Sequence, residues 1–395
     1  MNTLLNGVKV LDLTRVLAGP FTTMILADLG AEIIKVERPV TGDDSRSFGP
    51  YVNGESGYFM SINRNKKSIT LNLKSEEGKS LFKDLIKDFD VIIENFRPGT
   101  MDKLGLGYDT LKELNPGIIY AAVSGFGRTG PYSRRPAYDI VIQALGGLMS
   151  ITGQEGGSHT RVGASIGDIT AGLYGCIGVL GALVNRSTTG NGCLVDVAML
   201  DCTVSILENA LSRFYATGDI PKPMGNRHPS IVPFETFEAV DGEIVIAAGN
   251  DVLWEKLCVL IDRYELFEDP RYSSNELRTL NYQDLRAELA TEIKKKGVEE
   301  WYTLLETAGI PGGPVNSIDQ VVKDPHVKAR GMVVEVEHPR AGTVNIPGNP
   351  IKINGGDRDE FTPSPVLGQH NAELFKRLLN IDDLKLEELK SRNII

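Results

Sequence analysis

Strand-like and helix-like segments alternate along the first 130 residues, and this alternation restricts the fold more than any other feature of the chain. Short apolar runs that predict strands occupy residues 8–13, 32–37, 68–73, 91–95 and 118–123. The helices between them begin near Pro20, Ser75 and Asp109, residue types that favour a helix start. Strands joined by helices through short connections pair in parallel with right-handed crossovers. We therefore expect an α/β fold with a doubly wound parallel sheet.

The chain of 395 residues is longer than one hydrophobic core usually supports, so we expect two domains. Residues 1–217 predict a large domain, and the Pro- and Gly-rich segment 218–233 (GDIPKPMGNRHPSIVP) predicts a linker. Strand and helix signals at 234–310 predict a smaller α+β domain, and IPGGPV marks the start of a return linker at 311–330. Within 331–395 we expect a strand, a turn-rich stretch at 338–356 and a helix from Asn371.

Composition excludes several classes of protein. The formal charge of −10 argues against nucleic-acid binding, which needs an excess of basic residues. The four cysteines are far apart and the histidines do not cluster with them, which disfavours a disulfide framework or a metal site and favours a reducing cytoplasm. No signal peptide is evident, and the uncharged stretch 169–185 predicts a buried helix rather than a membrane span.

Basic residues recur where the predicted strands end. Arg15, Arg38, Lys74 and Arg97 follow strands one to four. Further cations are expected in nearby loops, namely Lys66, Lys67, Lys103, Arg134 and Arg135. Ligands of open α/β sheets bind at the carboxyl ends of the strands, so this pattern predicts a site for a polyanionic ligand. The first turn reads RVLAGP and lacks the G-x-G-x-x-G fingerprint, which argues against a nicotinamide dinucleotide.

Two candidate nucleophiles lie side by side. Residues 163–167 match G-x-S-x-G, so Ser165 could act as a hydrolase nucleophile with His370, although the preceding segment is polar rather than a buried strand. Asp168 lies at the expected start of the following helix, and we predict that it is the N-cap residue. A carboxylate at such a place could also attack an activated carbonyl. That helix carries a glycine at every third position: Gly172, Gly175, Gly178 and Gly181. Each costs ~1 kcal/mol relative to alanine, so we expect a backbone or a bulky ligand to pack closely there.

Several ordered segments resemble the class III CoA-transferases, also called the CaiB/BaiF or formyl-CoA transferase family. The similarity extends over essentially the whole chain and is carried by GVKVLDLTRVLAGPFTTMILADLGAEIIKVERP, NRNKKSITLNLKSEEG, ENFRPGTMDKLGLGYDTLKELNPGIIY, SGFGRTGPY, VGASIGDITAGLYG and LGQHN. The resemblance implies an interlocked homodimer of chains, each with a Rossmann-like large domain and a small domain. It also implies that residues 331–395 complete the large domain.

The resemblance assigns the chemistry to Asp168. The family aspartate attacks an acyl-CoA thioester, giving an aspartyl mixed anhydride and then an aspartyl-CoA thioester, from which CoA passes to a free carboxylic acid. Coenzyme A is thus a substrate, and neither a tightly bound cofactor nor a metal is implied. The family positions that contact CoA match Val16, Leu17, Arg38, Leu71, Asn72, Lys74, Asn95, Phe96, Arg97, Lys103, Arg135, Pro136, Ala137 and Tyr138.

Departures from the family pattern bear on the substrates. Leu17 stands where formyl-CoA:oxalate enzymes have glutamine, and GNRHPSIVPFETF replaces their glycine-rich loop, so formate and oxalate are disfavoured as a pair. The α-methylacyl-CoA racemases of the same family carry G-H-D where this chain has Ala137, Tyr138 and Asp139. A tyrosine at the position of the base argues against racemisation. A racemase, a serine hydrolase and a non-catalytic CoA-binding protein remain the alternatives, and the donor and acceptor acids stay open.

Overall fold

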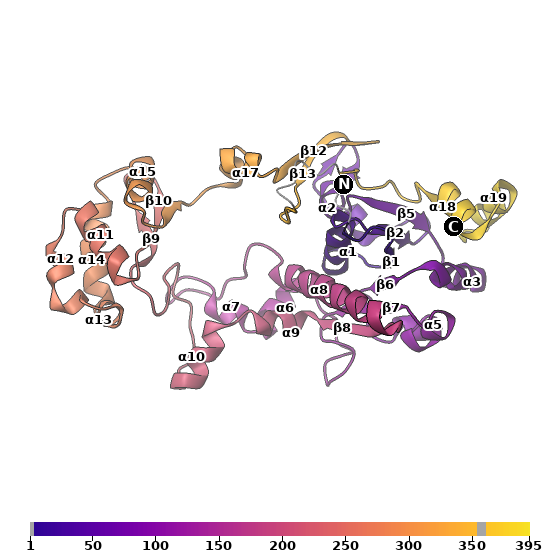
Figure 1. Cartoon of the computed structure of the whole chain (residues 1–395), viewed down its shortest axis with the longest axis horizontal. Coiled ribbons are helices and arrows are strands. Elements are labelled where there is room, and N and C mark those ends of the chain that lie inside the picture. The colour runs from indigo at the N-terminus through magenta and orange to yellow at the C-terminus, as the bar shows by residue number, and fades with distance from the viewer. Residues whose placement is uncertain (1–3, 354–360) are drawn as a thin grey trace. The chain divides into compact units, whose positions relative to one another are not determined.

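The computed structural model describes residues 4–353 and 361–395, which form two compact units (Figure 1). The large unit comprises the described parts of Met1–Met149, Arg161–Thr217 and Pro325–Ile395. The small unit comprises Ser150–Thr160 and Gly218–Asp324. The small unit is therefore inserted, in chain order, into the sequence of the large one.

A six-stranded parallel sheet forms the centre of the large unit. Its strands are β1 (Lys9–Asp12), β2 (Glu32–Glu37), β5 (Lys66–Thr70), β6 (Val91–Glu94), β7 (Ile119–Ser124) and β8 (Leu194–Ala198). Their spatial order is β5-β2-β1-β6-β7-β8, so the strand order reverses between β1 and β6, as in a Rossmann sheet. The expected doubly wound parallel sheet is confirmed.

Two local expectations in this region are wrong. The strand expected at 68–73 begins at Lys66 and ends at Thr70, because the chain turns after Leu71 and the Ser75 N–H donates to the Asn72 carbonyl. Asp109 does not cap α5 (Tyr108–Leu114); Gly107 holds that position, and Asp109 lies in the first turn. A carboxylate in the first turn also stabilises the positive end of the helix dipole, which explains the similar sequence signal.

Helices cover both faces of the sheet. On one face, α3 (Glu76–Leu85), α5, α18 (Asn371–Leu379) and α19 (Asp383–Ser391) pack on strand residues such as Leu11 and Ile34. On the other, α1 (Ala18–Asp28) and α8 (Ile166–Thr189) pack on Val10 and Ile33. Successive strand side chains point to opposite faces, which accounts for this division. The C-terminal helices lie beside α3 and β5 (Figure 1), so segments from both ends of the sequence build this unit.

The glycines of α8 are explained by packing against the protein itself. A Cβ on Gly172 would lie 2.8 Å from the Ala18 carbonyl oxygen, and one on Gly175 would lie 2.7 Å from Thr22 Oγ1. The Thr22 hydroxyl donates to the Gly172 carbonyl at 2.9 Å, so α1 and α8 approach backbone to backbone. Gly178 packs on Val195, whereas Gly181 faces open space. The close approach of α1, rather than a bulky ligand, therefore explains Gly172 and Gly175, the two glycines of this series nearest to Asp168.

Although α8 is long and apolar enough by composition to cross a membrane, 44% of its most apolar window is buried inside the protein. Cys176, Val179 and Ala182 belong to the core between α8 and the sheet.

The small unit has an antiparallel sheet in the order β11-β10-β9, formed by β9 (Phe234–Glu238), β10 (Glu243–Ala247) and β11 (Gly312–Pro314). Helices α11 (Asp251–Leu260), α14 (Tyr282–Ile293) and α15 (Val298–Ala308) surround its core. The return linker expected from residue 311 therefore begins too early, since β11 pairs with β10. A Cβ on Gly312 would lie 2.7 Å from both Leu305 Cδ1 and the Val245 carbonyl oxygen, so this glycine serves tight packing rather than a flexible connection.

Shorter elements complete the two units. In the large unit, β12 (Val333–His338) and β13 (Gly342–Pro347) form a hairpin, so a strand occupies part of the stretch 338–356 expected to be turn-rich. Residues 354–356 of that stretch lie outside the described residues. The other elements are β3 (Tyr51–Val52), β4 (Glu55–Ser56), α2 (Gly57–Ile62), α4 (Thr100–Lys103), α6 (Asp139–Leu145), α7 (Leu148–Ile151), α9 (Met199–Ser205), α10 (Asn209–Thr217), α12 (Glu265–Glu268), α13 (Asn275–Leu280), α16 (Ile318–Val321), α17 (Pro325–Ala329) and the 3₁₀ turns η1 (Asp44–Ser47), η2 (Ile86–Asp88) and η3 (Pro270–Tyr272).

Candidate active site

Two neighbouring cavities of the large unit open at the carboxyl ends of the strands. One, of about 260 Å³, is lined by Asp168 and is called the Asp168 pocket here. The other, of about 430 Å³, is lined by Arg38 and is called the Arg38 pocket. Both include Arg15, which follows β1, and Phe96, which follows β6. They therefore flank the point at which the strand order reverses, where open α/β sheets bind their ligands.

Almost all of the predicted site residues line these two cavities. The Asp168 pocket contains Val16, Leu17, Asn95, Phe96, Arg97, Arg135, Pro136, Ala137, Tyr138 and Asp168. The Arg38 pocket contains Arg38, Leu71, Asn72, Lys74 and Phe96. Lys103 lines neither cavity; it is an exposed residue of α4, the helix that places Thr100 at the Arg38 pocket.

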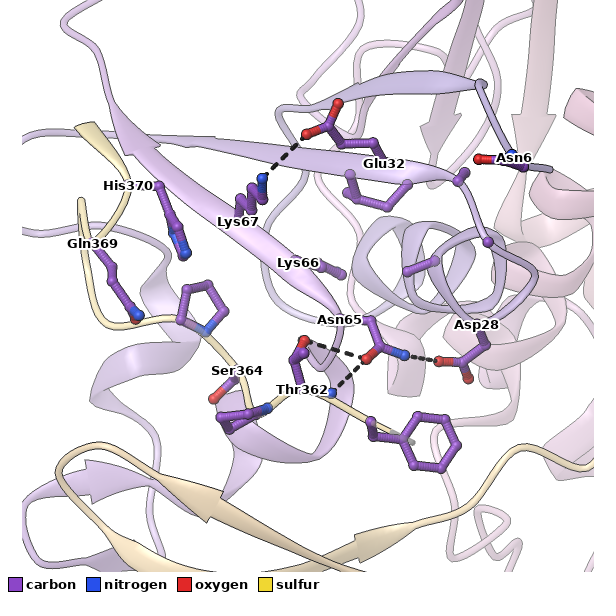
Figure 2. A pocket seen from close by; sticks show the side chains of 17 residues that line it. Asn6, Asp28, Glu32, Asn65, Lys66, Lys67, Thr362, Ser364, Gln369 and His370 are labelled. Carbon is purple, nitrogen blue, oxygen red and sulfur yellow. Dashed lines mark hydrogen bonds and ion pairs between the residues drawn. The ribbon is translucent and has the colours of Figure 1, made fainter. Parts of the chain in front are cut away.

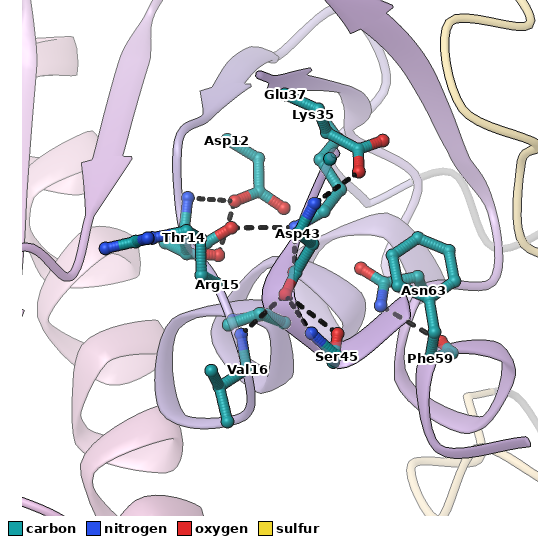
Figure 3. Close-up of polar contacts among 12 residues, drawn as sticks. Asp12, Thr14, Arg15, Val16, Lys35, Glu37, Asp43, Ser45, Phe59 and Asn63 are labelled. Carbon is teal, nitrogen blue, oxygen red and sulfur yellow. Dashed lines mark hydrogen bonds and ion pairs between the residues drawn. The ribbon is translucent and has the colours of Figure 1, made fainter. Parts of the chain in front are cut away.

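A strained loop after β1 shapes the entrance to the Asp168 pocket. Val16 has a φ of +66°, which is unfavourable for a β-branched residue. Its N–H donates to Asp43 Oδ1 at 3.0 Å, and the Asn95 side chain both accepts from the Arg15 N–H at 2.8 Å and donates to the Arg15 carbonyl at 2.7 Å. Figure 3 shows the Asp43 side chain directed at this turn. The Asp43 and Asn95 side chains thus hold a conformation that the backbone alone would not favour.

A buried ion pair between Lys35 and Asp43 stabilises the loop after β1. Lys35 Nζ lies 2.9 Å from Asp43 Oδ2 and donates to the Thr14 carbonyl at 2.7 Å (Figure 3). Burial alone would raise the pKa of Asp43, but the Lys35 ammonium and the two backbone donors outweigh it and hold that pKa well below its ordinary value. Because a buried ion pair is costly to break on one side, removing either partner would disturb the loop.

Lys66 and Lys67, two cations expected near the ligand, form ion pairs within the protein instead. Lys66 is fully buried in β5, and its ammonium lies 3.2 Å from Asp12 Oδ2. Lys67 is the next residue of the same strand and pairs with Glu32 at 3.3 Å and Glu373 at 3.0 Å. Both belong to β5 rather than to a loop, so the expectation that they face a polyanion is wrong.

Other cations at the two pockets remain accessible. Lys74, Arg97 and Arg135 are exposed, and none of them forms an ion pair with a residue that the structure describes. Arg38 and Arg15 instead share Asp44, with Arg15 Nη1 at 3.0 Å from Asp44 Oδ2. The edge of the sheet therefore presents several positive charges toward solvent beside the two cavities.

The Asp168 carboxylate stands in the first turn of α8. Ser165 is the N-cap residue and Asp168 is the third residue of the helix, so the predicted capping role of Asp168 is wrong. The acceptor for the helix start is instead Asp139 of α6, whose Oδ1 accepts from the Gly167 N–H at 2.9 Å. Among the described residues, none donates a hydrogen bond to the Asp168 carboxylate. It is therefore free to react.

Burial raises the pKa of Asp168 to about 7, and the nearby negative charge of Asp139 adds to the effect. The ionised carboxylate is consequently a stronger base and nucleophile than an exposed aspartate. Tyr58 lies near enough for the charges of Asp168, Asp43 and Asp139 to add to its burial and raise its pKa to about 12. The Tyr58 hydroxyl thus stays neutral at physiological pH.

A third cavity, of about 480 Å³, lies at the start of β2 and β5 and along the segment 361–370 (Figure 2). His370 lines it and accepts at Nδ1 from the Ser68 N–H, on the free edge of β5. Three strands separate β5 from β7, whose end lines the Asp168 pocket, a span of ~19 Å at the usual strand spacing. His370 is too far away to activate Ser165, so the prediction of a hydrolase site in which His370 activates Ser165 is wrong.

Sequence reasoning missed several residues of the site. Asp43 and Asp139 act through hydrogen bonds to backbone atoms distant in sequence, and Asp44 pairs with both Arg15 and Arg38. The only available signal was local: an Asp that precedes Ser45 by two residues is typical of a turn cap, and the Asp43 side chain does accept from the Ser45 N–H.

Comparison with known proteins agrees with this geometry. The sequence profile of CoA-transferase family III matches residues 5–371. The chain is 41% identical over 392 residues to succinyl-CoA:glutarate CoA-transferase of Homo sapiens, covering 99% of this chain and 90% of that protein. It is 44% identical over 373 residues to acetyl-CoA:oxalate CoA-transferase of Acetobacter aceti, covering 94% and 95%.

A solved structure is also similar. A CaiB/BaiF family protein from Brucella suis superposes with a TM-score of 0.85 at 40% identity, over 96% of this chain and all of that one (100%). Similarity over 96% of the chain, together with a family match over residues 5–371, extends through both units. The chain therefore belongs to CoA-transferase family III and is an enzyme that transfers CoA from an acyl-CoA to a carboxylic acid.

Proposed function

We propose that Asp168 is the nucleophile of this transfer. Its carboxylate attacks the thioester carbonyl of the donor, forming an aspartyl mixed anhydride and releasing the CoA thiolate. The thiolate then attacks the aspartyl carbonyl, which gives an aspartyl-CoA thioester and frees the donor acid. An acceptor carboxylate reverses the two steps and leaves as the new acyl-CoA.

The observation that carries the proposal is the free carboxylate of Asp168 in a cavity at the switch point of the sheet. Its raised pKa makes the ionised form basic, which favours attack on a carbonyl carbon. Each step exchanges one activated acyl group for another, so no ATP, metal or resident cofactor is required.

We propose that the adjacent pockets divide the acyl-CoA between them. The accessible ammonium and guanidinium groups of Lys74, Arg97 and Arg135 suit the phosphates, since arginine donates bidentately to them. The Arg38 pocket takes the remainder of the CoA, and the Asp168 pocket takes the thioester. Its other lining residues then contact CoA as the resemblance implies, with Lys103 contributing least.

The acids are proposed to be dicarboxylates, with succinyl-CoA or acetyl-CoA as the donor. Support comes from the two relatives, whose names specify glutarate and oxalate. A racemase is less well supported, because Tyr138, at the position of the racemase base, is 74% exposed and is not a basic residue. A non-catalytic CoA-binding role would not explain why the Asp168 carboxylate in this pocket has a raised pKa and no hydrogen-bond donor among the described residues.

We further propose that two chains form a homodimer, interlocked as in the family, in the cytoplasm. The large unit exposes a run of apolar side chains on α8, including Leu173, Ile177 and Val184, with Ile177 62% exposed. Exposed apolar residues of α6 and α10, among them Leu145 and Tyr215, add to the apolar surface. Light scattering after size exclusion tests the dimer, and fractionation of the source cells tests the location.

The decisive experiment is an exchange assay. The protein is incubated with succinyl-CoA or acetyl-CoA and a panel of free acids, and the acyl-CoA products are identified by mass spectrometry. Hydroxylamine trapping during turnover should modify Asp168. Asp168→Ala should abolish exchange, whereas Ser165→Ala should retain it. Exchange by Asp168→Ala, or no product with any acid, would overturn the proposal, and deuterium wash-in at the α-carbon would instead indicate a racemase.

A further inference from the structure

We propose that Asp139 and Gln143 of α6 are positioning residues for the nucleophile. They fix the start of α8 through the backbone and so leave the Asp168 carboxylate uncommitted. This inference rests on the proposed role of Asp168 and extends it to residues that do not themselves touch the reacting atoms.

A chain of three hydrogen bonds carries the inference. Asp139 Oδ1 accepts from the Gly167 N–H at 2.9 Å, and Asp139 Oδ2 accepts from Gln143 Nε2 at 2.7 Å. Gln143 Oε1 in turn accepts from the Val162 N–H at 2.9 Å. Both side chains are buried, with exposures of 8% and 0%. The two ends of the segment 162–167 are therefore tied to one turn of α6.

This arrangement replaces the usual cap. A helix normally satisfies its first N–H groups with its own N-cap side chain, but the Ser165 hydroxyl makes no such bond. Asp139 supplies the acceptor from another helix, so no side chain of α8 is needed for capping. The close approach favours glycine: a Cβ on Gly167 would lie 3.1 Å from Asp139 Oδ1 and 3.2 Å from Ile142 Cγ2, so one of these side chains would have to shift by a few tenths of an ångström.

The same carboxylate adds a negative charge near Asp168, which raises the pKa of Asp168 further than burial alone does. Asp139 on α6 is the charge that acts on Asp168, and the charges of Asp168, Asp43 and Asp139 act in turn on Tyr58 of α2. The other charged or titratable groups that line the same pocket are Arg15, Asp44, Arg97, Arg135 and Tyr138. Arg161 lies 4.0 Å from Asp139 Oδ2, at the limit of an ion pair, and its own side chain is exposed. Asp139 thus combines two effects on the nucleophile, one of position and one of basicity.

Two variants separate these effects. Asp139→Asn keeps an oxygen that can accept from the Gly167 N–H but removes the charge, so the titration of Asp168 should move to lower pH while kcat falls about tenfold. Gln143→Leu removes the tie to Val162 and keeps the charge, so kcat should fall about tenfold or more with the KM for acyl-CoA changed less than threefold. Asp109→Asn, which removes an exposed charge from the first turn of α5, is the matched control and should change neither.

The titration is read without activity, from the carboxyl carbons of ¹³C-aspartate-labelled protein, with the Asp168 signal assigned by its loss in Asp168→Asn. Melting temperatures within a few degrees of the parent show that the variants fold. A midpoint that is unmoved in Asp139→Asn, together with an unchanged kcat in Gln143→Leu, would overturn the inference. If the parent enzyme exchanges no acid, the proposed function fails, yet a shifted titration would still support the effect of Asp139 on Asp168.

Discussion

Asp168→Asn should stabilise the large unit at neutral and alkaline pH while removing activity. The folded protein raises the pKa of this carboxyl from an ordinary 3.8 to about 7, chiefly by burial. Ionisation of Asp168 is therefore less favourable in the folded state than in the unfolded chain, which lowers the free energy of unfolding. A rise of that size corresponds to ~4 kcal/mol, and asparagine, which is neutral and nearly the same shape, avoids it.

The sign fixes the pH window. Below pH 3.8 the carboxyl is protonated in both states and the penalty is absent. As the pH rises through 3.8 toward 7, the unfolded chain loses its proton first, so the parent protein becomes progressively less stable relative to the variant. Above pH 7 the difference is constant and largest. The variant's advantage should therefore grow across this interval and then level off.

The measurement must report on the large unit. Both tryptophans, Trp254 and Trp301, belong to the small unit, so their fluorescence follows that unit and serves as an internal control. Hydrogen exchange of peptides from α8 and β7 follows the large unit, and ~4 kcal/mol corresponds to a roughly thousandfold lower population of the open state. Equal exchange of parent and variant at pH 8, or an advantage that does not change between pH 5 and pH 8, would refute the reasoning.

The remaining predictions concern pH, CoA and folding. The kcat/KM of the parent should rise with pH through about 7 as Asp168 ionises in the free enzyme, and a flat profile between pH 6 and pH 8 would contradict that assignment. Arg97→Ala should raise the KM for acyl-CoA about tenfold in steady-state assays, since one charge-assisted contact contributes ~1.5 kcal/mol, whereas Lys103→Ala, outside both pockets, should change it less than twofold. Arg64→Met should destabilise the large unit by ~3–5 kcal/mol in urea denaturation, because it leaves Asp28 buried without the guanidinium that lies 2.5 Å from it; a loss below 1 kcal/mol would show that the pair contributes little.

The parallel sheet could be predicted because alternation of strands and helices is a local pattern with few topological solutions. Arg15, Arg38, Lys74 and Arg97 could be placed at one edge of the sheet because each follows a strand, and the carboxyl ends of parallel strands coincide. Lys66 could not be assigned in this way, since a lysine that pairs with a buried aspartate has the same sequence signal as one in solvent.

The start of α8 shows a different limit. Its sequence predicts Asp168 as the cap, yet the acceptor is Asp139, which lies 28 residues earlier than Gly167. Tertiary contacts of this kind leave no local pattern. The glycines of α8 were a correct sign of close packing, but only the structure identifies α1 as the partner for Gly172 and Gly175.

The placement of α18 and α19 on the face that also carries α3 has a consequence for synthesis of the chain. The ribosome releases all six strands and the whole of the small unit before it releases α18 and α19, which help to cover Leu11 and Ile34. Until then the nascent sheet leaves part of this apolar face open to water and to other chains. We expect chaperones to engage the nascent protein at this stage, and chains that terminate before residue 371 to be degraded rather than to accumulate as active fragments.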